Sequence, residues 1–248
     1  MAALRDIAAD RQLLLCCDFD GTLSEIVARP EDARLMAGIK PLLELLSHSR
    51  DTRICLISGR SLRDLITRTQ LSESVIMIGS HGAESALHCD PVLCSQQADL
   101  LTRLKETLHQ SLVSVEGVQL EYKPYSISVH VRRASRQTAR SVIAALRLGP
   151  ARWPGVISMN GKEVIELGVY HTDKGKAIDR LRNALGADYR VVYIGDDVTD
   201  EHAFYALSPS DVGIKVGAGS THANYKVDSP SAVKQVLEIL VESRCKQC

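Results

Sequence analysis

Aromatic residues and net charge are both scarce in this sequence. Phe, Trp and Tyr make up 4% of the 248 residues, so an aromatic platform for stacking nucleic-acid bases is not expected. Thirty Lys and Arg residues balance thirty Asp and Glu residues, which argues against nucleic acid or an anionic membrane as the partner. No apolar run approaches the roughly 20 residues that a membrane-spanning helix needs. What remains is a globular protein with an aliphatic core, for which 45% apolar and 24% charged residues are ordinary values.

A secretory signal and a disulfide framework are also lacking. The first ten residues carry three charges where a signal peptide has an apolar stretch. The seven cysteines are an odd number, and Cys16, Cys17 and Cys55 lie inside apolar runs, as small buried side chains do. Cys245 and Cys248 form a C-x-x-C without the second half that a zinc site needs. We therefore expect reduced thiols, no structural zinc and a cytoplasmic location.

Short apolar runs alternate with amphipathic segments at both ends of the chain. Such runs are typical of strands covered by helices on both faces, and they occupy residues 13–17, 54–57, 75–78, 191–194 and 212–214. The amphipathic segments predict helices over residues 39–46, 62–69, 175–185 and 232–241. This alternation predicts a doubly wound, Rossmann-like α/β sheet, in which ligands bind beyond the carboxyl ends of the strands.

The middle of the chain has a different pattern, and we expect it to be an inserted α+β domain of order α-β-β-α-β-β. Its predicted elements are a helix over 97–112, strands over 118–123 and 127–132, a helix over 136–146, and strands over 156–159 and 163–167. The Asn160–Gly161 pair predicts the turn of the last hairpin. The domains are then a core of residues 1–95 and 174–248, and an insert of residues 96–173.

The motif Asp18-Phe-Asp20-Gly-Thr directly follows the first apolar run. Carboxylates at positions i and i+2 of an extended segment point the same way, here off the end of a strand. Because like charges that close repel, a divalent cation is the natural compensation, and hard oxygen ligands suit Mg²⁺. The alternative is a solvated acidic turn that ends a strand.

Three further segments follow apolar runs or begin helices. Ser58 lies at a predicted strand end, where it could hold an anionic oxygen or simply cap the next helix. Lys174 opens a helix against the helix dipole, which suggests that it neutralises an anion. Asp196, Asp197 and Asp200 place three carboxylates behind a buried strand, which is costly without a compensating cation.

In the insert, charged residues gather on one predicted sheet face. Glu121 and Lys123 lie on the same face of their strand because side chains alternate. In the next strand His130 and Arg132 lie on the face opposite Val131. Such a face could bind a ligand rich in hydroxyl groups, or it could be the solvated side of a half-exposed sheet.

In order and type, the four core segments resemble the motifs of the haloacid-dehalogenase-like (HAD) phosphatase superfamily. The matching positions are Asp18 and Asp20, Ser58, Lys174, and Asp196 with Asp197, followed by Asp200 as a further acidic position. The resemblance implies a HAD core with an inserted cap domain of the C2 type.

Three other segments resemble the trehalose-6-phosphate phosphatase family. Residues 121–132 are similar to its E-x-K-x-x-S-x-x-x-H-x-R signature, residues 160–166 to its second cap motif, and residues 79–84 to its G-x-H-G-x-E segment. Phe19 stands where that family commonly has Tyr, and this removes no required polar group. The residues expected to bind the substrate are Arg60, His81, Gly82, Glu84, Glu121, Lys123, His130, Arg132, Asn160, Lys162 and Glu166.

The resemblance implies Mg²⁺-dependent removal of the phosphate of trehalose 6-phosphate, the last step of trehalose biosynthesis. Asp18 is then the nucleophile that forms an aspartyl-phosphate, and Asp20 is the general acid and base. Mg²⁺ is bound by Asp18, the backbone carbonyl of Asp20, and Asp196. Ser58 and Lys174 stabilise the transferring phosphoryl group. The resemblance also implies that Asp197 and Asp200 either support the metal ligands or fix Lys174, and that closure of the cap excludes water.

Other functions stay open at this point. A related sugar phosphatase, acting on sucrose 6-phosphate or mannosyl-3-phosphoglycerate, would differ mainly in its cap contacts. A phosphohexomutase could share the core, and an inactive sugar-phosphate sensor would keep the binding residues. Balanced charge favours a monomer without nucleic-acid or membrane partners.

Overall fold

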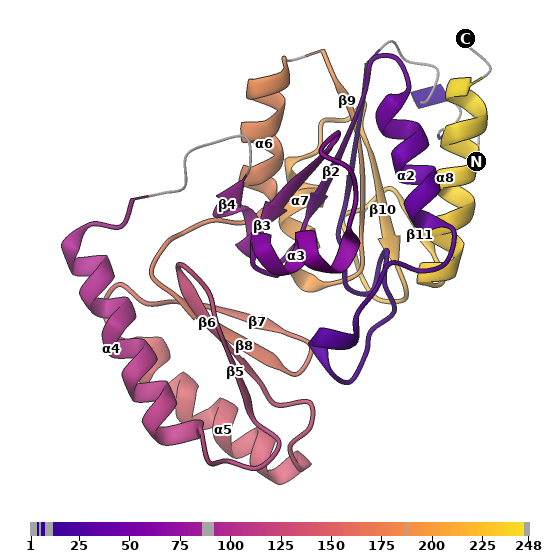
Figure 1. Cartoon of the computed structure of the whole chain (residues 1–248). Coiled ribbons are helices and arrows are strands. Elements are labelled where there is room, and N and C mark those ends of the chain that lie inside the picture. Colours follow the sequence, from indigo (N-terminus) through magenta and orange to yellow (C-terminus); the bar gives the residue numbers. More distant parts are fainter. Residues whose placement is uncertain (1–3, 5, 8–11, 86–91, 187, 246–248) are drawn as a thin grey trace. The chain divides into compact units, whose positions relative to one another are not determined.

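The computed structural model describes residues 4, 6, 7, 12–85, 92–186 and 188–245, and it divides into two compact units (Figure 1). Unit 1 comprises residues 1–89 and 172–248, and unit 2 comprises residues 90–171. These boundaries lie six and two residues before those expected from the sequence pattern. Cys89 and Cys248 lie outside the described residues, as does the side chain of Cys245.

Unit 1 is built on a seven-stranded sheet of order β11-β10-β9-β1-β2-β3-β4. Its strands are β1 (Leu13–Cys17), β2 (Thr52–Ile57), β3 (Val75–Gly79), β4 (Glu84–Ser85), β9 (Arg190–Gly195), β10 (Val212–Val216) and β11 (Tyr225–Val227). Neighbouring strands are parallel except β4, which pairs antiparallel with β3. Every residue of the central strand β1 is buried, because helices cover both faces of the sheet.

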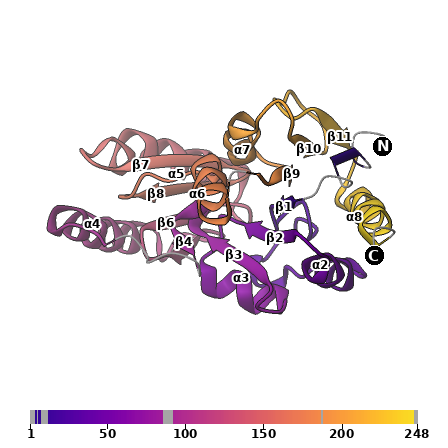
Figure 2. The same ribbon diagram turned by 90° about the horizontal axis from the view of Figure 1, so that it is seen from above.

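The two faces of β1 pack against different helices. The helices are α2 (Ile39–His48), α3 (Leu62–Thr69), α6 (Lys174–Leu185), α7 (Glu201–Ala206) and α8 (Pro230–Cys245), with 3₁₀ turns η1 (Pro30–Asp32), η2 (Ser80–Gly82) and η4 (Val198–Asp200). Leu13 and Leu15 belong to one hydrophobic cluster with α2, α3 and α8. Leu14 and Cys16 belong to another with α6 and α7, and Figure 2 shows these helices on opposite sides of the sheet. The expected doubly wound architecture is confirmed.

The order of the strands reverses between β1 and β9. The chain runs outward from β1 through β2 and β3, and then returns to the other side of β1 for β9 and β10. Ligands of open α/β sheets bind at the carboxyl ends of the strands at such a reversal. The backbone N–H of Asp18 donates to the carbonyl oxygen of Ile194 at 2.8 Å, so the segments that follow the two strands begin side by side.

Unit 2 has two layers. Its elements are α4 (Ser95–Leu112), β5 (Gln119–Tyr122), β6 (Ser126–His130), α5 (Arg136–Leu148), the 3₁₀ turn η3 (Pro150–Arg152), β7 (Ile157–Gly161) and β8 (Val164–Gly168). The strands form an antiparallel sheet of order β5-β6-β8-β7. Leu104 and Leu108 of α4 and Leu146 of α5 pack with Val129 and Ile165 in the core of the unit. Helices therefore cover one face of this sheet.

The turn of the β7–β8 hairpin differs from the prediction. Asn160 and Gly161 lie inside β7, and the turn is made by Lys162 and Glu163. The reason is the register of β8, which is fixed by its pairing with β6 through buried residues such as Ile165. All five residues of β7 pair with β8 in this register, and this pairing outweighs the local preference of Asn-Gly for a turn.

Among the described residues, no helix is long and apolar enough to cross a membrane.

Candidate active site

Asp18 is the first residue after β1 and is buried at the carboxyl edge of the sheet. Its Oδ1 lies 2.9 Å from Nζ of Lys174, the first residue of α6. Burial raises the pKa of the Asp18 carboxyl group well above its ordinary value, although the charge of Lys174 opposes this shift. The neighbouring carboxylate of Asp200 raises the pKa further.

Lys174 joins two carboxylates that are far apart in the sequence. Its Nζ donates to Asp200 Oδ1 at 2.7 Å while it contacts Asp18, and its side chain is 2% exposed. Burial alone would lower the pKa of Lys174, but the two carboxylates outweigh burial and raise it. The ammonium group is therefore charged at neutral pH and available to balance an anion beside Asp18.

Asp200 is fully buried, and protein groups contact both of its carboxylate oxygens. Oδ1 accepts from Lys174 and from the hydroxyl of Tyr193, and Oδ2 accepts from the backbone N–H of Asp197 at 2.8 Å. Burial would raise its pKa, yet the charge of Lys174 and these hydrogen bonds lower it. Asp200 thus acts as an ionised partner that orients Lys174.

Asp18, Asp196 and Asp200 form a cluster of buried carboxylates, with one oxygen of each within 4.8 Å of the others. Gly21 allows this approach: it adopts φ +78°, and a Cβ atom there would lie 2.4 Å from Asp196 Oδ2. Hard oxygen donors at this density fit a divalent cation such as Mg²⁺, which would offset the repulsion between the carboxylates. Asp200 is a member of this cluster, whereas the family resemblance implied that it supports the metal ligands or Lys174.

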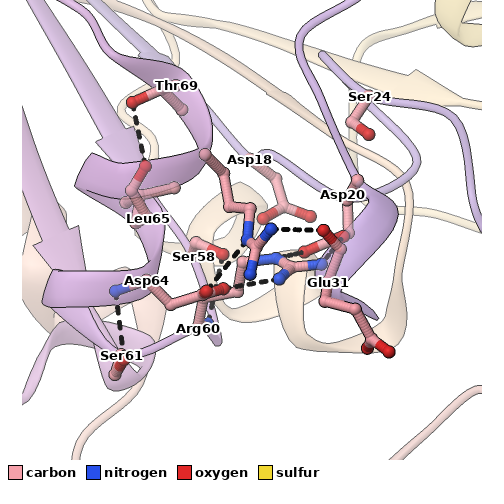
Figure 3. A network of polar contacts seen from close by, with 12 residues as sticks. Asp18, Asp20, Ser24, Glu31, Ser58, Arg60, Ser61, Asp64, Leu65 and Thr69 are labelled. Carbon is pink, nitrogen blue, oxygen red and sulfur yellow. Dashed lines mark hydrogen bonds and ion pairs between the residues drawn. The ribbon is translucent and has the colours of Figure 1, made fainter. Parts of the chain in front are cut away.

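Asp20 is held by Arg60, and Figure 3 shows this contact beside Asp18. Nε and Nη2 of Arg60 donate to the two carboxylate oxygens of Asp20, each at 2.7 Å. Nη1 of Arg60 donates to Asp64 Oδ2 at 2.6 Å. Burial would lower the pKa of Arg60, but its two carboxylate partners raise it. The structure thus pairs Arg60, which was expected to bind substrate, with the expected general acid.

Ser58 follows β2 and lies beside the loop after β3. The backbone N–H of His81 donates to the carbonyl oxygen of Ser58 at 2.9 Å, and a Cβ atom at Gly59 would lie 2.6 Å from the His81 ring. Ser80 and His81 both adopt left-handed backbone angles, with φ +47° and +54°, which costs energy in residues other than glycine. The Ser80 hydroxyl donates to the buried carboxylate of Glu84. The structure therefore brings Ser58, His81 and Glu84 to one corner of unit 1.

Gly82 completes this loop. Its carbonyl oxygen accepts from Arg180 Nη2 at 3.0 Å, and a Cβ atom there would lie 2.9 Å from the hydroxyl oxygen of Thr172. Gly82 therefore allows the loop to pack tightly against the start of α6.

In unit 2, two of the expected binding residues, Glu121 and Glu166, lie on the sheet face opposite the helices. Glu121, Ser128 and Glu166 occupy one row of directly paired positions across β5, β6 and β8. Glu166 accepts from Lys123 at 2.5 Å, from Ser126 at 2.7 Å and from Ser128 at 2.8 Å. Lys123, Ser126, Ser128 and Glu166 are buried and Glu121 is half-buried, and we call these five residues the polar row.

His130 adjoins the polar row. Its Nε2 lies 2.9 Å from Glu121 Oε2. Burial alone would raise the pKa of Glu121, but the hydrogen bond with His130 and the charge of Lys123 outweigh it and lower the pKa.

The remaining expected binding residues of unit 2 lie elsewhere. Arg132 pairs with Glu163 at 3.1 Å near the β7–β8 turn, where Lys162 is exposed. Asn160 pairs with Ile165, so it lies on the helix-covered face, and its Oδ1 accepts from Arg147 of α5 at 2.8 Å. Asn160 is therefore not brought to the polar row.

Sequence reasoning missed three residues that shape the site. Tyr193 lies within the apolar run of β9, and its hydroxyl group, which donates to Asp200, is the only sign of a role in the site. Asp64 and Arg68 contact each other at 3.0 Å. The spacing of Arg60, Asp64 and Arg68 at i, i+4 and i+8 was the available signal.

Comparison with known proteins gives a consistent result. A family model described as trehalose-phosphatase matches residues 16–234. A trehalose-phosphate phosphatase of Mycobacterium bovis is 34% identical over 251 residues, covering 96% of this chain and 63% of that protein. An uncharacterized glycosyl hydrolase of Mycobacterium tuberculosis is 34% identical over 254 residues, covering 96% of this chain and 19% of that protein. The chain thus spans less than two thirds of the length of these relatives.

A solved structure supports the fold. The crystal structure of a trehalose-6-phosphate phosphatase related protein matches 95% of this chain and 100% of its own, with a TM-score of 0.79 and 27% identity. A phosphatase of the haloalkanoate (HAD) enzyme superfamily from Bacteroides thetaiotaomicron shares the fold over 92% of this chain, with a TM-score of 0.59 and 14% identity. The expected HAD-type fold is therefore confirmed, while the C2 type of the cap stays a prediction.

Proposed function

Because the chain belongs to the trehalose-phosphatase family, we propose that it hydrolyses trehalose 6-phosphate to trehalose and inorganic phosphate. The observation that carries the proposal is the buried carboxylate of Asp18, which lies 2.9 Å from the Lys174 ammonium group within a cluster of carboxylates. A nucleophile, a charge for the phosphoryl group and donors for a cation thus lie together in unit 1.

Asp18 is the nucleophile of the first step. One of its oxygens forms a bond to phosphorus while the bond from phosphorus to the sugar oxygen breaks, which gives an aspartyl-phosphate and, once the sugar oxygen is protonated, the free sugar. Lys174 balances the negative charge of the phosphoryl oxygens, and the hydroxyl of Ser58 donates to one of them. Asp200 keeps Lys174 in place through the 2.7 Å contact.

Asp20 moves the protons. Its carboxyl group donates a proton to the departing sugar oxygen, and the resulting carboxylate then takes a proton from the water that attacks the aspartyl-phosphate. Phosphate leaves and Asp18 is regenerated, so atoms and charges balance over the cycle. Asp20 suits this task because its side chain is 33% exposed, whereas Asp18 is buried.

Asp18, Asp196 and the backbone carbonyl oxygen of Asp20 would hold Mg²⁺, with Asp200 and Asp197 supporting them. When bound, the cation would neutralise charge on the phosphoryl oxygens and on the nucleophile. The support for this assignment is the buried carboxylate cluster in unit 1.

We propose that unit 2 recognises the sugar through its polar row. Carboxylate, ammonium and hydroxyl groups on one sheet face match the hydroxyl groups of a disaccharide, which both donate and accept hydrogen bonds. Glu121, Lys123 and Glu166 are the residues that we assign to this task. His130 supports Glu121 at 2.9 Å.

Phosphate release from a panel of sugar phosphates, with and without Mg²⁺, tests the function. We expect trehalose 6-phosphate to have the highest kcat/KM, with little release after chelation. Preference for sucrose 6-phosphate or mannosyl-3-phosphoglycerate would assign a different sugar phosphatase. Formation of glucose 6-phosphate from glucose 1-phosphate would indicate a mutase, and tight binding without release would indicate a sensor.

Two expectations from the sequence stay predictions. Cytoplasmic location agrees with the free thiols of Cys16, Cys17, Cys55 and Cys94. The monomeric state can be measured by light scattering.

A further inference from the structure

The carboxylate of Asp20 has one dominant partner in unit 1. Arg60 approaches it with two parallel hydrogen bonds, Nε to Oδ2 and Nη2 to Oδ1, both 2.7 Å long. This bidentate geometry fixes the plane of the carboxylate as well as its position, because the guanidinium group is rigid and planar. The side chain of Arg60 is 10% exposed, so it is itself enclosed by the protein.

Arg60 is oriented in turn by Asp64. The Oδ2 atom of Asp64 accepts from Arg60 Nη1 at 2.6 Å, and its Oδ1 atom accepts from Arg68 Nε at 3.0 Å. Arg68 also donates to the backbone carbonyl oxygen of Glu31, which connects the chain of contacts to the η1 turn. Asp20 therefore stands at one end of a chain of four alternating charges.

The backbone around Arg60 is fixed as well. Its N–H donates to the hydroxyl oxygen of Ser58 at 3.2 Å, and its carbonyl oxygen accepts from the N–H of Ser80 at 2.7 Å. The backbone N–H of Asp64 donates to Ser61, the N-cap residue of α3, at 3.3 Å. Both ends of the Arg60–Asp64 pair are thus anchored in regular structure.

We propose that Arg60 and Asp64 are positioning residues for the proton-transferring carboxyl group of Asp20, an inference that rests on the proposed function. Nε, Nη1 and Nη2 of Arg60 each donate to a protein carboxylate, so its charge is directed at Asp20 and Asp64. This arrangement aims the Asp20 side chain and does not itself touch the phosphoryl group.

The effect of mutating Arg60 or Asp64 should then depend on the leaving group of the substrate. A poor leaving group, such as a sugar alkoxide or phenoxide, needs the proton of Asp20 as the bond to phosphorus breaks. A p-nitrophenolate departs readily without that proton. Misplacing Asp20 should therefore lower kcat/KM, which reports the steps up to aspartyl-phosphate formation, for the first class of substrate and spare it for the second.

The experiment compares phenyl phosphate with p-nitrophenyl phosphate in the full chain with Mg²⁺. The variants are Asp64→Asn, Arg60→Lys and, as a matched control, Arg63→Gln, which changes an exposed arginine of the same helix. We expect kcat/KM on phenyl phosphate to fall about 10-fold in Asp64→Asn and about 100-fold in Arg60→Lys. Losses of kcat/KM on p-nitrophenyl phosphate should stay within about 3-fold, and Arg63→Gln should match the wild type.

A double-mutant cycle separates positioning from structural damage. In an Asp20→Asn background no carboxyl group remains to be aimed, so adding Asp64→Asn should change kcat/KM on phenyl phosphate by less than about 2-fold. Multiplicative losses in this background would overturn the inference. Equal losses of kcat/KM on both aryl phosphates, or a loss that comes only from a raised KM at constant kcat, would also overturn it, because these indicate general damage or direct substrate binding.

The aryl pair also separates this inference from the proposed substrate. If the wild type hydrolyses both aryl phosphates but not trehalose 6-phosphate, the proposed substrate fails and the leaving-group comparison still decides the role of Arg60. If no phosphate ester is hydrolysed, the proposed function and the positioning role are both wrong. Circular dichroism shows whether each variant folds. If Arg60→Lys does not fold, the double-mutant cycle of Asp64→Asn with Asp20→Asn decides whether the positioning role is correct.

Discussion

The hydroxyl of Tyr193 donates to Asp200 Oδ1 at 2.6 Å, the same oxygen that accepts from Lys174. Both side chains are buried, Tyr193 on the central part of the sheet and Asp200 in the turn after it. Burial raises the pKa of Tyr193 and the charge of Asp200 raises it further, so the hydroxyl stays a donor. The tyrosine therefore helps to hold the carboxylate that orients the lysine beside Asp18.

Replacing Tyr193 by Phe should weaken both the fold and the reaction. Asp200 loses one donor to a buried charge, for which about 1–3 kcal/mol of unfolding free energy is expected. Urea denaturation measures this loss, and kcat should fall because Lys174 is less firmly placed. Tyr205→Phe is the control, since Tyr205 is 66% exposed. An unchanged midpoint in Tyr193→Phe would show that the hydrogen bond contributes nothing.

Gly21→Ala should abolish activity for a steric reason. The new Cβ atom would lie 2.4 Å from Asp196 Oδ2, and this would push Asp196 away from Asp18. Gly217→Ala is a matched control, because Gly217 also has a positive φ (+82°) but no atom within 4 Å of the added Cβ. Both variants bear the backbone strain of alanine at positive φ, so only the collision differs. Comparable activity of the two variants would contradict this account.

Mg²⁺ should stabilise the folded chain through the carboxylate cluster. A ligand that binds only the native state raises the melting temperature in proportion to the logarithm of its concentration at saturation. We expect differential scanning fluorimetry to show such a rise for the wild type and a much smaller one for Asp196→Asn. Ca²⁺ and Na⁺ at matched ionic strength serve as controls. A rise of the same size in Asp196→Asn would place the cation elsewhere.

The sequence predicted the positions at strand ends well, because they depend on two simple facts. A continuous apolar run identifies a buried strand, and parallel strands bring their carboxyl ends to one edge of the sheet. Asp18, Ser58 and Asp196 therefore lie where the pattern placed them. The partner of Arg60 was beyond this reasoning, since it depends on side-chain directions in a loop and not on strand order.

Local preference failed where long-range pairing decides the structure. Asn160–Gly161 is a strong turn signal, yet β8 is already paired with β6 and its register extends β7 through both residues. The same register turns Asn160 toward Arg147 and away from Glu166. The local sequence pattern cannot show whether the turn preference or the strand pairing is stronger, because the pairing partners of β8 lie more than thirty residues earlier in the chain, in β6.

Glu121 should make the stability of unit 2 depend on acid pH. Its pKa is lowered in the folded state, so its contribution is present above the ordinary value near 4.5 and is lost as the pH falls through the lower folded value. Lys123, His130 and Glu166 are the other charged or titratable groups beside it. In Glu121→Gln this dependence should disappear.

The fluorescence of Trp153, the single tryptophan, reports on unit 2 during urea denaturation. The wild type should be more stable than Glu121→Gln at pH 6, and the two stabilities should converge toward pH 3. A constant difference across this range would mean that the charge of Glu121 is not the cause.

Glu166→Gln tests whether the polar row recognises sugar. The change keeps the size of the side chain but removes the negative charge that three donors share at 2.5–2.8 Å, so Lys123 and its neighbours lose their common acceptor. We expect kcat/KM for trehalose 6-phosphate to fall at least about 10-fold, with little change for p-nitrophenyl phosphate, which has no sugar to bind. Glu116→Gln, an exposed carboxylate of the same unit, should leave both values unchanged. Equal losses on the two substrates would show that Glu166 supports the fold of unit 2 and does not select the sugar.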